Sequence, residues 1–184
     1  MSKTEAIHYD GISKIFHWLT VILIFAAFVL GPGDFGRLVH ANGDPGARLD
    51  IVWHETLGIS IFALTFLRLL WVALRSGAPD HKLEPKLRLA SRLMHIALWT
   101  LLFALPLTAL LTLASEGQPL TLLGGLRITE LPWIASAPVL GVADWGDIHS
   151  FLGDAIIWLA GIHAVAALYH HFVLKDGVFR SMLP

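Results

Sequence analysis

Four long apolar segments, separated by polar stretches, dominate the sequence. Each is close to or longer than the roughly 20 residues that a helix needs to cross a bilayer. They cover, approximately, residues 14–30, 51–74, 92–114 and 147–174. The pattern predicts an all-α integral membrane protein, in which residues 1–184 form one domain built on a bundle of four transmembrane helices.

The long segment between the third and fourth spans, residues 115–146, is less uniform. It contains apolar stretches, but charged residues and prolines interrupt them at Arg127, Glu130, Pro132 and Pro138. We therefore expect residues 115–146 to fold as a cap of short helices outside the membrane rather than as a fifth span.

Composition supports a membrane protein and excludes several kinds of site. Hydrophobic residues make up 55% of the 184 residues and charged residues only 15%, against roughly 25% charged residues in ordinary globular domains. The formal net charge of -1 provides no basic excess for contacts with nucleic-acid phosphates. The chain has no cysteine, which excludes disulfides, iron–sulfur clusters, thiolate zinc sites and covalent c-type haem attachment.

Lysine and arginine are distributed unevenly across the predicted membrane. Both termini and the loop after the second span carry Lys3, Lys14, Arg75, Lys82, Lys86, Arg88, Arg92, Lys175 and Arg180. The opposite loops carry only Arg37, Arg48 and Arg127. The positive-inside rule then predicts a bacterial inner-membrane protein with both termini in the cytoplasm and the cap in the periplasm.

Histidines inside apolar segments are the main candidates for chemistry, because ionisable side chains are costly at membrane depth. His149 and His163 are 14 residues apart, which places them on one helix face about 21 Å apart along the axis. By depth, His54 is level with His149 on the outer side, and His17 is level with His163 on the inner side. Depth alone would also allow His170 to replace His163 opposite His17.

Two histidines on facing helices in a dry bundle are typical of haem b, whose iron takes two axial imidazoles. Gly58 and Gly153 each follow a histidine by four residues and would leave room for a porphyrin, although small residues also serve simple helix packing. Three alternatives remain: histidines that only bond across helices, a zinc or copper site in a transporter, and a structural bundle without haem.

Arg68 and Asp154 are charged residues well inside the predicted spans. Arg68 follows His54 by 14 residues, so it lies about 21 Å further inward on nearly the same face. A buried arginine needs an anion, which an inner haem propionate or a quinone head group could supply; the alternative is an arginine that reaches the inner interface. Asp154 has no evident partner.

Several short runs of the sequence resemble those of the bacterial cytochrome b-561 family, in particular its small members described as superoxide oxidases. The runs are Ile15-Phe16-His17-Trp18, His54 with Gly58-Ile59-Ser60, Arg68-Leu69, Phe103-Ala104-Leu105-Pro106, Gly161 through His171, and Lys175-Asp176. The resemblance covers nearly the whole chain. It implies two b haems, the outer one on His54 and His149 and the inner one on His17 and His163. It also implies quinone chemistry near the inner haem, where we expect His95, His170 and Arg68.

The resemblance implies transfer of electrons from periplasmic superoxide to ubiquinone through the two haems. The charge of the predicted outer loops and their edges does not favour an anionic substrate. These regions contain three arginines but eight carboxylates: Asp34, Asp44, Asp50, Glu55, Glu116, Glu130, Asp144 and Asp147. Such a field would steer superoxide poorly unless arginines gather locally over the outer haem. The alternative is a quinone-linked cytochrome b subunit or relay that exchanges electrons with a periplasmic redox protein or dehydrogenase.

Overall fold

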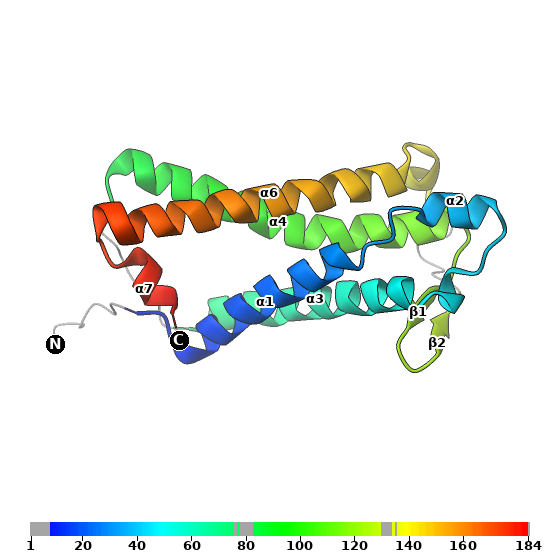
Figure 1. Cartoon of the computed structure of the whole chain (residues 1–184), viewed down its shortest axis with the longest axis horizontal. Coiled ribbons are helices and arrows are strands. Elements are labelled where there is room, and N and C mark those ends of the chain that lie inside the picture. The colour runs from blue at the N-terminus through cyan, green and yellow to red at the C-terminus, as the bar shows by residue number, and fades with distance from the viewer. Residues whose placement is uncertain (1–7, 76, 78–82, 130–133, 135, 184) are drawn as a thin grey trace.

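The computed structural model describes residues 8–75, 77, 83–129, 134 and 136–183. Within these residues, four helices are long and apolar enough to cross a membrane. They are α1 (Gly11–Val29), α3 (Leu49–Leu74), α4 (Pro85–Ser115) and α6 (Trp145–Tyr169), and they run side by side along the long axis of the molecule (Figure 1). The predicted bundle of four membrane helices is confirmed.

The start of the third span differs most from the sequence-based boundaries. Helix α4 begins at Pro85, seven residues before the predicted start of the third span. Proline suits the first position of a helix, because its φ is preset and its missing N–H would have no partner there. Helix α6 continues into a π-helical segment, η3 (His170–Leu174), which ends at Lys175 with a left-handed φ of 54°.

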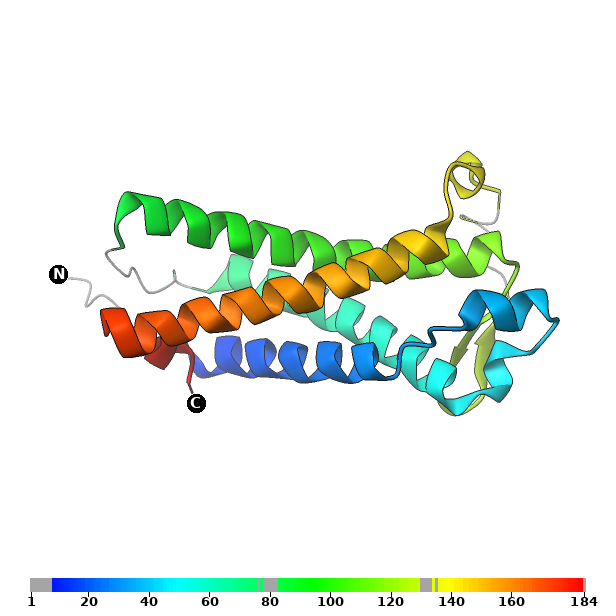
Figure 2. The ribbon, with the colours of Figure 1, turned by 45° about the horizontal axis from the view of Figure 1, so that its top comes forward.

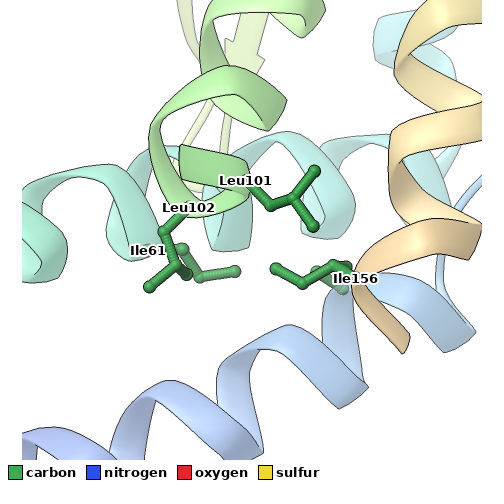
Figure 3. Packing of buried hydrophobic residues seen from close by; sticks show 5 residues of the cluster. Ile61, Leu101, Leu102 and Ile156 are labelled. Carbon is green, nitrogen blue, oxygen red and sulfur yellow. The ribbon is translucent and has the colours of Figure 1, made fainter. Parts of the chain in front are cut away.

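The four long helices are arranged as two pairs. Helix α1 packs mainly against α3, and α4 packs mainly against α6 (Figure 2). A small apolar core joins the pairs, and its members come from all four helices: Ala27, Ile61, Leu101, Leu102 and Ile156 (Figure 3). Ile156 lies seven residues from both His149 and His163, so this core is about 10 Å from each histidine level.

The outer surface of the bundle is strongly apolar. Large side chains such as Ile15, Phe25 and Trp158 are more than 60% exposed in the protein alone. A surface of this kind is characteristic of contact with lipid rather than water.

The two ends of the described chain meet at one end of the bundle (Figure 1). The Tyr9 N–H donates to the Ser181 carbonyl at 3.1 Å, and the Trp18 indole donates to the Met182 carbonyl at 3.0 Å. These bonds hold the short helix α7 (Val178–Met182) across the start of α1.

The opposite end of the bundle carries the cap, which also includes the loop between α1 and α3. Its described elements are α2 (Phe35–His40), η1 (Pro45–Ala47), strands β1 (Leu120–Leu122) and β2 (Leu126–Ile128), and η2 (Pro138–Gly141). The described part of residues 115–146 contains a short helix, η2, as expected, but the first part of this segment forms an antiparallel hairpin, which was not expected. The hairpin loop consists of Leu123, Gly124 and Gly125. The two glycines have φ of 87° and 80°, a left-handed conformation that glycine adopts without steric cost. Residues 130–133 and 135 lie outside the described residues.

The hairpin is tied to the outer end of α3. The Thr121 N–H donates to Glu55, and the Leu123 N–H donates to the Thr56 hydroxyl at 3.0 Å. The cap therefore lies directly over the first turns of the helix that carries His54.

Candidate functional site: two histidine pairs inside the bundle

The structure brings four predicted histidines together as two pairs. The ring centroids of His54 and His149 are 5.9 Å apart, and those of His17 and His163 are 6.4 Å apart. In both cases α6 supplies one histidine and the opposite helix pair supplies the other, so the sites lie between the two helix pairs. His163, rather than His170, is the ring next to His17.

These separations suit a shared metal ion. A metal–imidazole bond is about 2.0–2.1 Å, and a ring centroid lies roughly 1.1 Å behind its nitrogen, so rings on opposite sides of one ion are about 6 Å apart. Within the described residues, no group of three or more His, Cys, Asp or Glu side chains is placed so that it could hold a metal ion by itself. The arrangement therefore favours a cofactor with its own equatorial ligands.

The rings of the outer pair are held by backbone carbonyls. His54 Nδ1 donates to the Ala27 carbonyl at 2.8 Å, and His149 Nδ1 donates to the Leu105 carbonyl at 3.0 Å. A carbonyl can only accept, so each Nδ1 carries the proton and each Nε2 keeps a free lone pair. Metal-binding histidines are commonly oriented in this way.

A cavity of about 400 Å³ adjoins the outer pair. Gly58 and Gly153 both line it, and a Cβ placed at either glycine would meet no atom within 4 Å. The space beside these glycines is therefore open, as the sequence predicted for positions next to a porphyrin. The volume falls within the usual range of sites for small molecules and cofactors.

The inner pair has a different environment. His95, on α4, lies 5.3 Å from His163 by ring centroids, and its Nδ1 donates to the Ser91 carbonyl at 2.7 Å. The hydrogen bonds of the described residues include none from the rings of His17 or His163. Three imidazoles thus meet at the inner level, and only the one from α4 is anchored.

Arg68 lies beside the inner pair, as predicted. Its guanidinium is 5.1 Å from the centroid of the Trp99 ring and is close enough to interact electrostatically with His17 and His163. The side chain is only partly exposed, and no carboxylate of the described residues forms an ion pair with it. A cation in this position provides a site for an anionic group.

His170 lies apart from these rings, at the start of the π-helical segment. Its Nδ1 is bonded to the Asp176 carboxylate. Short π-helical segments are rare and are frequent at functional sites. The structure therefore places His170 at the end of the bundle where the chain termini meet, two helical turns beyond His163.

Sequence reasoning missed two contributions to the outer site and left the place of Asp154 open. Glu55, counted above with the outer loops, lies within α3 and lines the cavity, with one carboxyl oxygen buried and without a hydrogen-bond partner. Asp154 lines the same cavity. The carbonyls of Ala27 and Leu105 have no sequence signature, whereas Glu55 could have been noticed because it follows His54.

Two arginines of the cap are paired with carboxylates. Arg48 bonds to Asp50 and Asp34, which raise its pKa, and Arg127 bonds to Asp44 at 2.9 Å, which lowers the pKa of that carboxyl. Two of the three outer arginines are therefore neutralised locally. Among the described residues, Arg37 forms no ion pair.

Comparison with known proteins identifies the family. The family model described as prokaryotic cytochrome b561 matches residues 8–184. The chain belongs to the prokaryotic cytochrome b561 family. Members of this family are helical membrane proteins that bind haem b and transfer electrons across the membrane, so both properties are assigned to this chain.

Individual relatives are similar over nearly their whole length. "Cytochrome b561 homolog 2" of Escherichia coli is 30% identical and covers 95% of this chain and 90% of its own. "Probable superoxide oxidase CybB" of Yersinia pestis is 26% identical, with 91% of each chain covered. "Cytochrome b562" of Cereibacter sphaeroides is also 26% identical, with 98% of each covered.

The residues present fit haem b. The outer level offers two opposed imidazoles with free Nε2 atoms, glycines beside them and an adjacent cavity. The inner level offers two opposed imidazoles and Arg68, which forms no ion pair within the described part of the chain and suits a propionate.

Proposed function

We propose that this chain holds two haem b groups and transfers electrons between the two sides of the membrane. His54 and His149 would bind the iron of the outer haem, and His17 and His163 that of the inner one. The observation that carries the proposal is the presence of two level pairs of opposed imidazoles, 5.9 and 6.4 Å apart, in a family that binds haem b. The bound haems would supply one-electron oxidation and reduction.

The protein's own residues would position these groups and keep water from the path between them. The carbonyls of Ala27 and Leu105 fix the orientation of the outer imidazoles. The apolar core around Ile61 and Ile156 lies halfway between the two levels. Gly58 and Gly153 leave space for the outer macrocycle, and Arg68 would bind an inner propionate or a quinone head group.

We propose periplasmic superoxide as the electron donor and ubiquinone as the acceptor. Two superoxide anions would each lose one electron and leave as dioxygen, while one ubiquinone would take up two electrons and two protons to give ubiquinol. A quinone site next to the inner pair is supported by His95, 5.3 Å from His163, and by His170 at the same end of the bundle. Imidazoles are suitable proton donors near neutral pH.

The proposed orientation places both termini in the cytoplasm of a bacterial cell and the cap in the periplasm. It is supported by the excess of lysine and arginine at the end of the bundle where the described chain begins and ends. Because the chain has no cysteine, single cysteines introduced as Val142→Cys and Lys86→Cys can be labelled from each side. An impermeant thiol reagent added to intact spheroplasts should label only Val142→Cys; labelling of Lys86→Cys instead would reverse the orientation.

A second candidate is an electron relay to a periplasmic redox protein or dehydrogenase. It is favoured by the ion pairs of Arg48 and Arg127, which leave the cap with an excess of carboxylates. Such a surface suits a basic protein partner better than an anion. Both candidates share the haem ligands and differ in the donor.

The deciding experiment is rapid mixing of the detergent-purified protein with superoxide and then with ubiquinone, followed by haem absorbance. For a superoxide oxidase, the haem bands should be reduced at a rate near diffusion control and reoxidised by quinone. Haem bands that are not reduced by superoxide but are reduced by ubiquinol would identify the protein as a relay. Absence of b-type bands, or bands unaffected in His54→Ala and His163→Ala, would overturn the haem sites; His40→Ala, exposed on the cap, is the matched control.

A further inference from the structure

Arg68 and Asp154 lie well inside the long helices, have no ionic partner among the described residues, and lie at different histidine pairs. Arg68, on α3, interacts electrostatically with His17 and His163. Asp154, on α6, lines the cavity that also contains His54 and His149. Asp154 is five residues beyond His149, about 7.5 Å deeper into the bundle. The inner level therefore has a nearby positive charge and the outer level a nearby negative one.

Unpaired charges at this depth act strongly on any group that changes charge. Arg68 is only partly exposed, so water and salt screen it little, whereas Asp154 is exposed in the protein alone and lines the cavity, so its effect should be smaller. A fixed cation stabilises an added electron nearby, and a fixed anion destabilises it. Each residue also acts mainly on its own level, because Arg68 is about 21 Å along the helix from His54.

Resting on the two haem sites proposed above, we propose that Arg68 and Asp154 set the direction of electron transfer. Arg68 raises the electron affinity of the inner site, and Asp154 lowers that of the outer site. Electrons that enter on the cap side therefore move to the inner side with a favourable equilibrium constant. In this role both are positioning residues, since they act through the field at the redox groups and not by ligation.

A redox titration of the purified protein, followed by haem absorbance, tests this inference. The two signals are assigned with His54→Ala and His17→Ala. Arg68→Gln should lower the inner potential enough to reduce the outer-to-inner equilibrium constant about tenfold, which corresponds to about 59 mV for a one-electron couple. Asp154→Asn should raise the outer potential and reduce the same constant by a smaller factor, about threefold, because Glu55 remains at the cavity.

Matched controls separate this role from general effects of charge. Arg75→Gln removes an arginine at the same end of the bundle that already contacts Asp10 at 3.9 Å. Asp147→Asn removes an exposed carboxylate from the first turn of α6. Both should leave the equilibrium constant within about twofold, because these charges are paired or screened by water. Arg68→Lys keeps the charge and should keep the inner potential.

Two results would overturn the inference. One is an unchanged outer potential in Asp154→Asn. The other is an inner potential that falls as far in Arg68→Lys as in Arg68→Gln, since the charge is then irrelevant. If Arg68→Gln does not retain the inner haem, Arg68→Lys and Asp154→Asn decide the question. Protein without b-type bands would instead overturn the proposed function, so the two failures are distinguishable.

Discussion

The outer and inner histidine pairs are built from the same residue type at nearly the same ring separation, yet their surroundings differ. The outer rings are fixed by the carbonyls of Ala27 and Leu105 and adjoin a cavity. At the inner level a third imidazole, His95, lies against His163. Arg68, which has no ion-pair partner in the residues that the structure describes, lies beside both rings of the pair.

This difference indicates what each proposed haem site could do besides binding haem. Imidazole rings held by backbone hydrogen bonds next to an apolar core suit electron transfer, because little rearrangement is needed. Extra imidazoles and a cation suit a substrate that takes up protons as well as electrons, as a quinone does. The contrast between the two pairs therefore supports a division of labour, in which the outer level accepts electrons and the inner level completes the chemistry.

Replacing one histidine of either pair should have the largest effect, because it changes the haem content of one site and not of the other. Replacing His54 or His149 by alanine removes an axial ligand from the outer site, and replacing His17 or His163 does so for the inner site. We expect the haem content of each variant to fall by about half and the other site's spectrum to persist. Haem determination on purified protein measures this. His171→Ala is the inner control, and loss of both haems from every variant would contradict two independent sites.

Filling the outer cavity should break only the outer site. In Gly153→Leu the new side chain would enter space that is open in the protein alone. We expect loss of the outer haem signal, while the polypeptide itself gains up to about 1 kcal/mol of helix stability because glycine is a poor helix former. Haem content and thermal unfolding of the haem-free protein measure the two effects.

The control for this variant is Ser60→Leu, which adds the same bulk to an exposed position of α3 outside the cavity lining. It should keep both haem signals. Full haem content in Gly153→Leu would show that the glycine serves helix packing alone, which is the alternative that the sequence left open.

Changing the third imidazole should affect the inner site alone. We expect His95→Ala to keep both haems but to slow quinone reduction by about 100-fold, because a positioned proton donor is lost. Rapid mixing of pre-reduced protein with ubiquinone measures the rate, and the rate of outer reduction serves as the internal control. Loss of the inner haem from His95→Ala would mean that His95 replaces His17 as a ligand.

The sequence predicted the arrangement of the histidines well, because helix geometry is regular. The 14 residues from His149 to His163 correspond to almost four helical turns. Helix geometry alone therefore predicts two histidine levels on one face of the helix. The four spans followed equally directly from apolar length.

The rest depended on contacts that a linear pattern does not encode. The carbonyls that anchor His54 and His149 come from other helices, and every residue has a carbonyl. The hairpin of the cap was missed because Leu120–Leu122 and Leu126–Ile128 are too short to show alternation. The pairing of Arg48 and Arg127 with carboxylates also required the folded cap, and it weakens the idea of an arginine funnel for superoxide.

The smallest expected effect tests whether the inner pair depends on the end of α1. Asp10 caps this helix by accepting from the Ser13 N–H at 2.9 Å. Burial raises the pKa of Asp10, but bonds from Ser13 and Trp71 outweigh it and hold the pKa below its usual value. Its contribution is therefore present above about pH 4 and lost as the pH falls further.

Asp10→Ala should cost about 0.5–2 kcal/mol at neutral pH, as measured by thermal or denaturant unfolding, and the difference from the unmodified protein should shrink below about pH 4. Because α1 carries His17 and not the outer pair, the variant should broaden the inner haem signal and leave the outer one unchanged. An equal change in both haem signals would mean that the bundle responds as one unit. The two levels would then be structurally coupled although their chemistry differs.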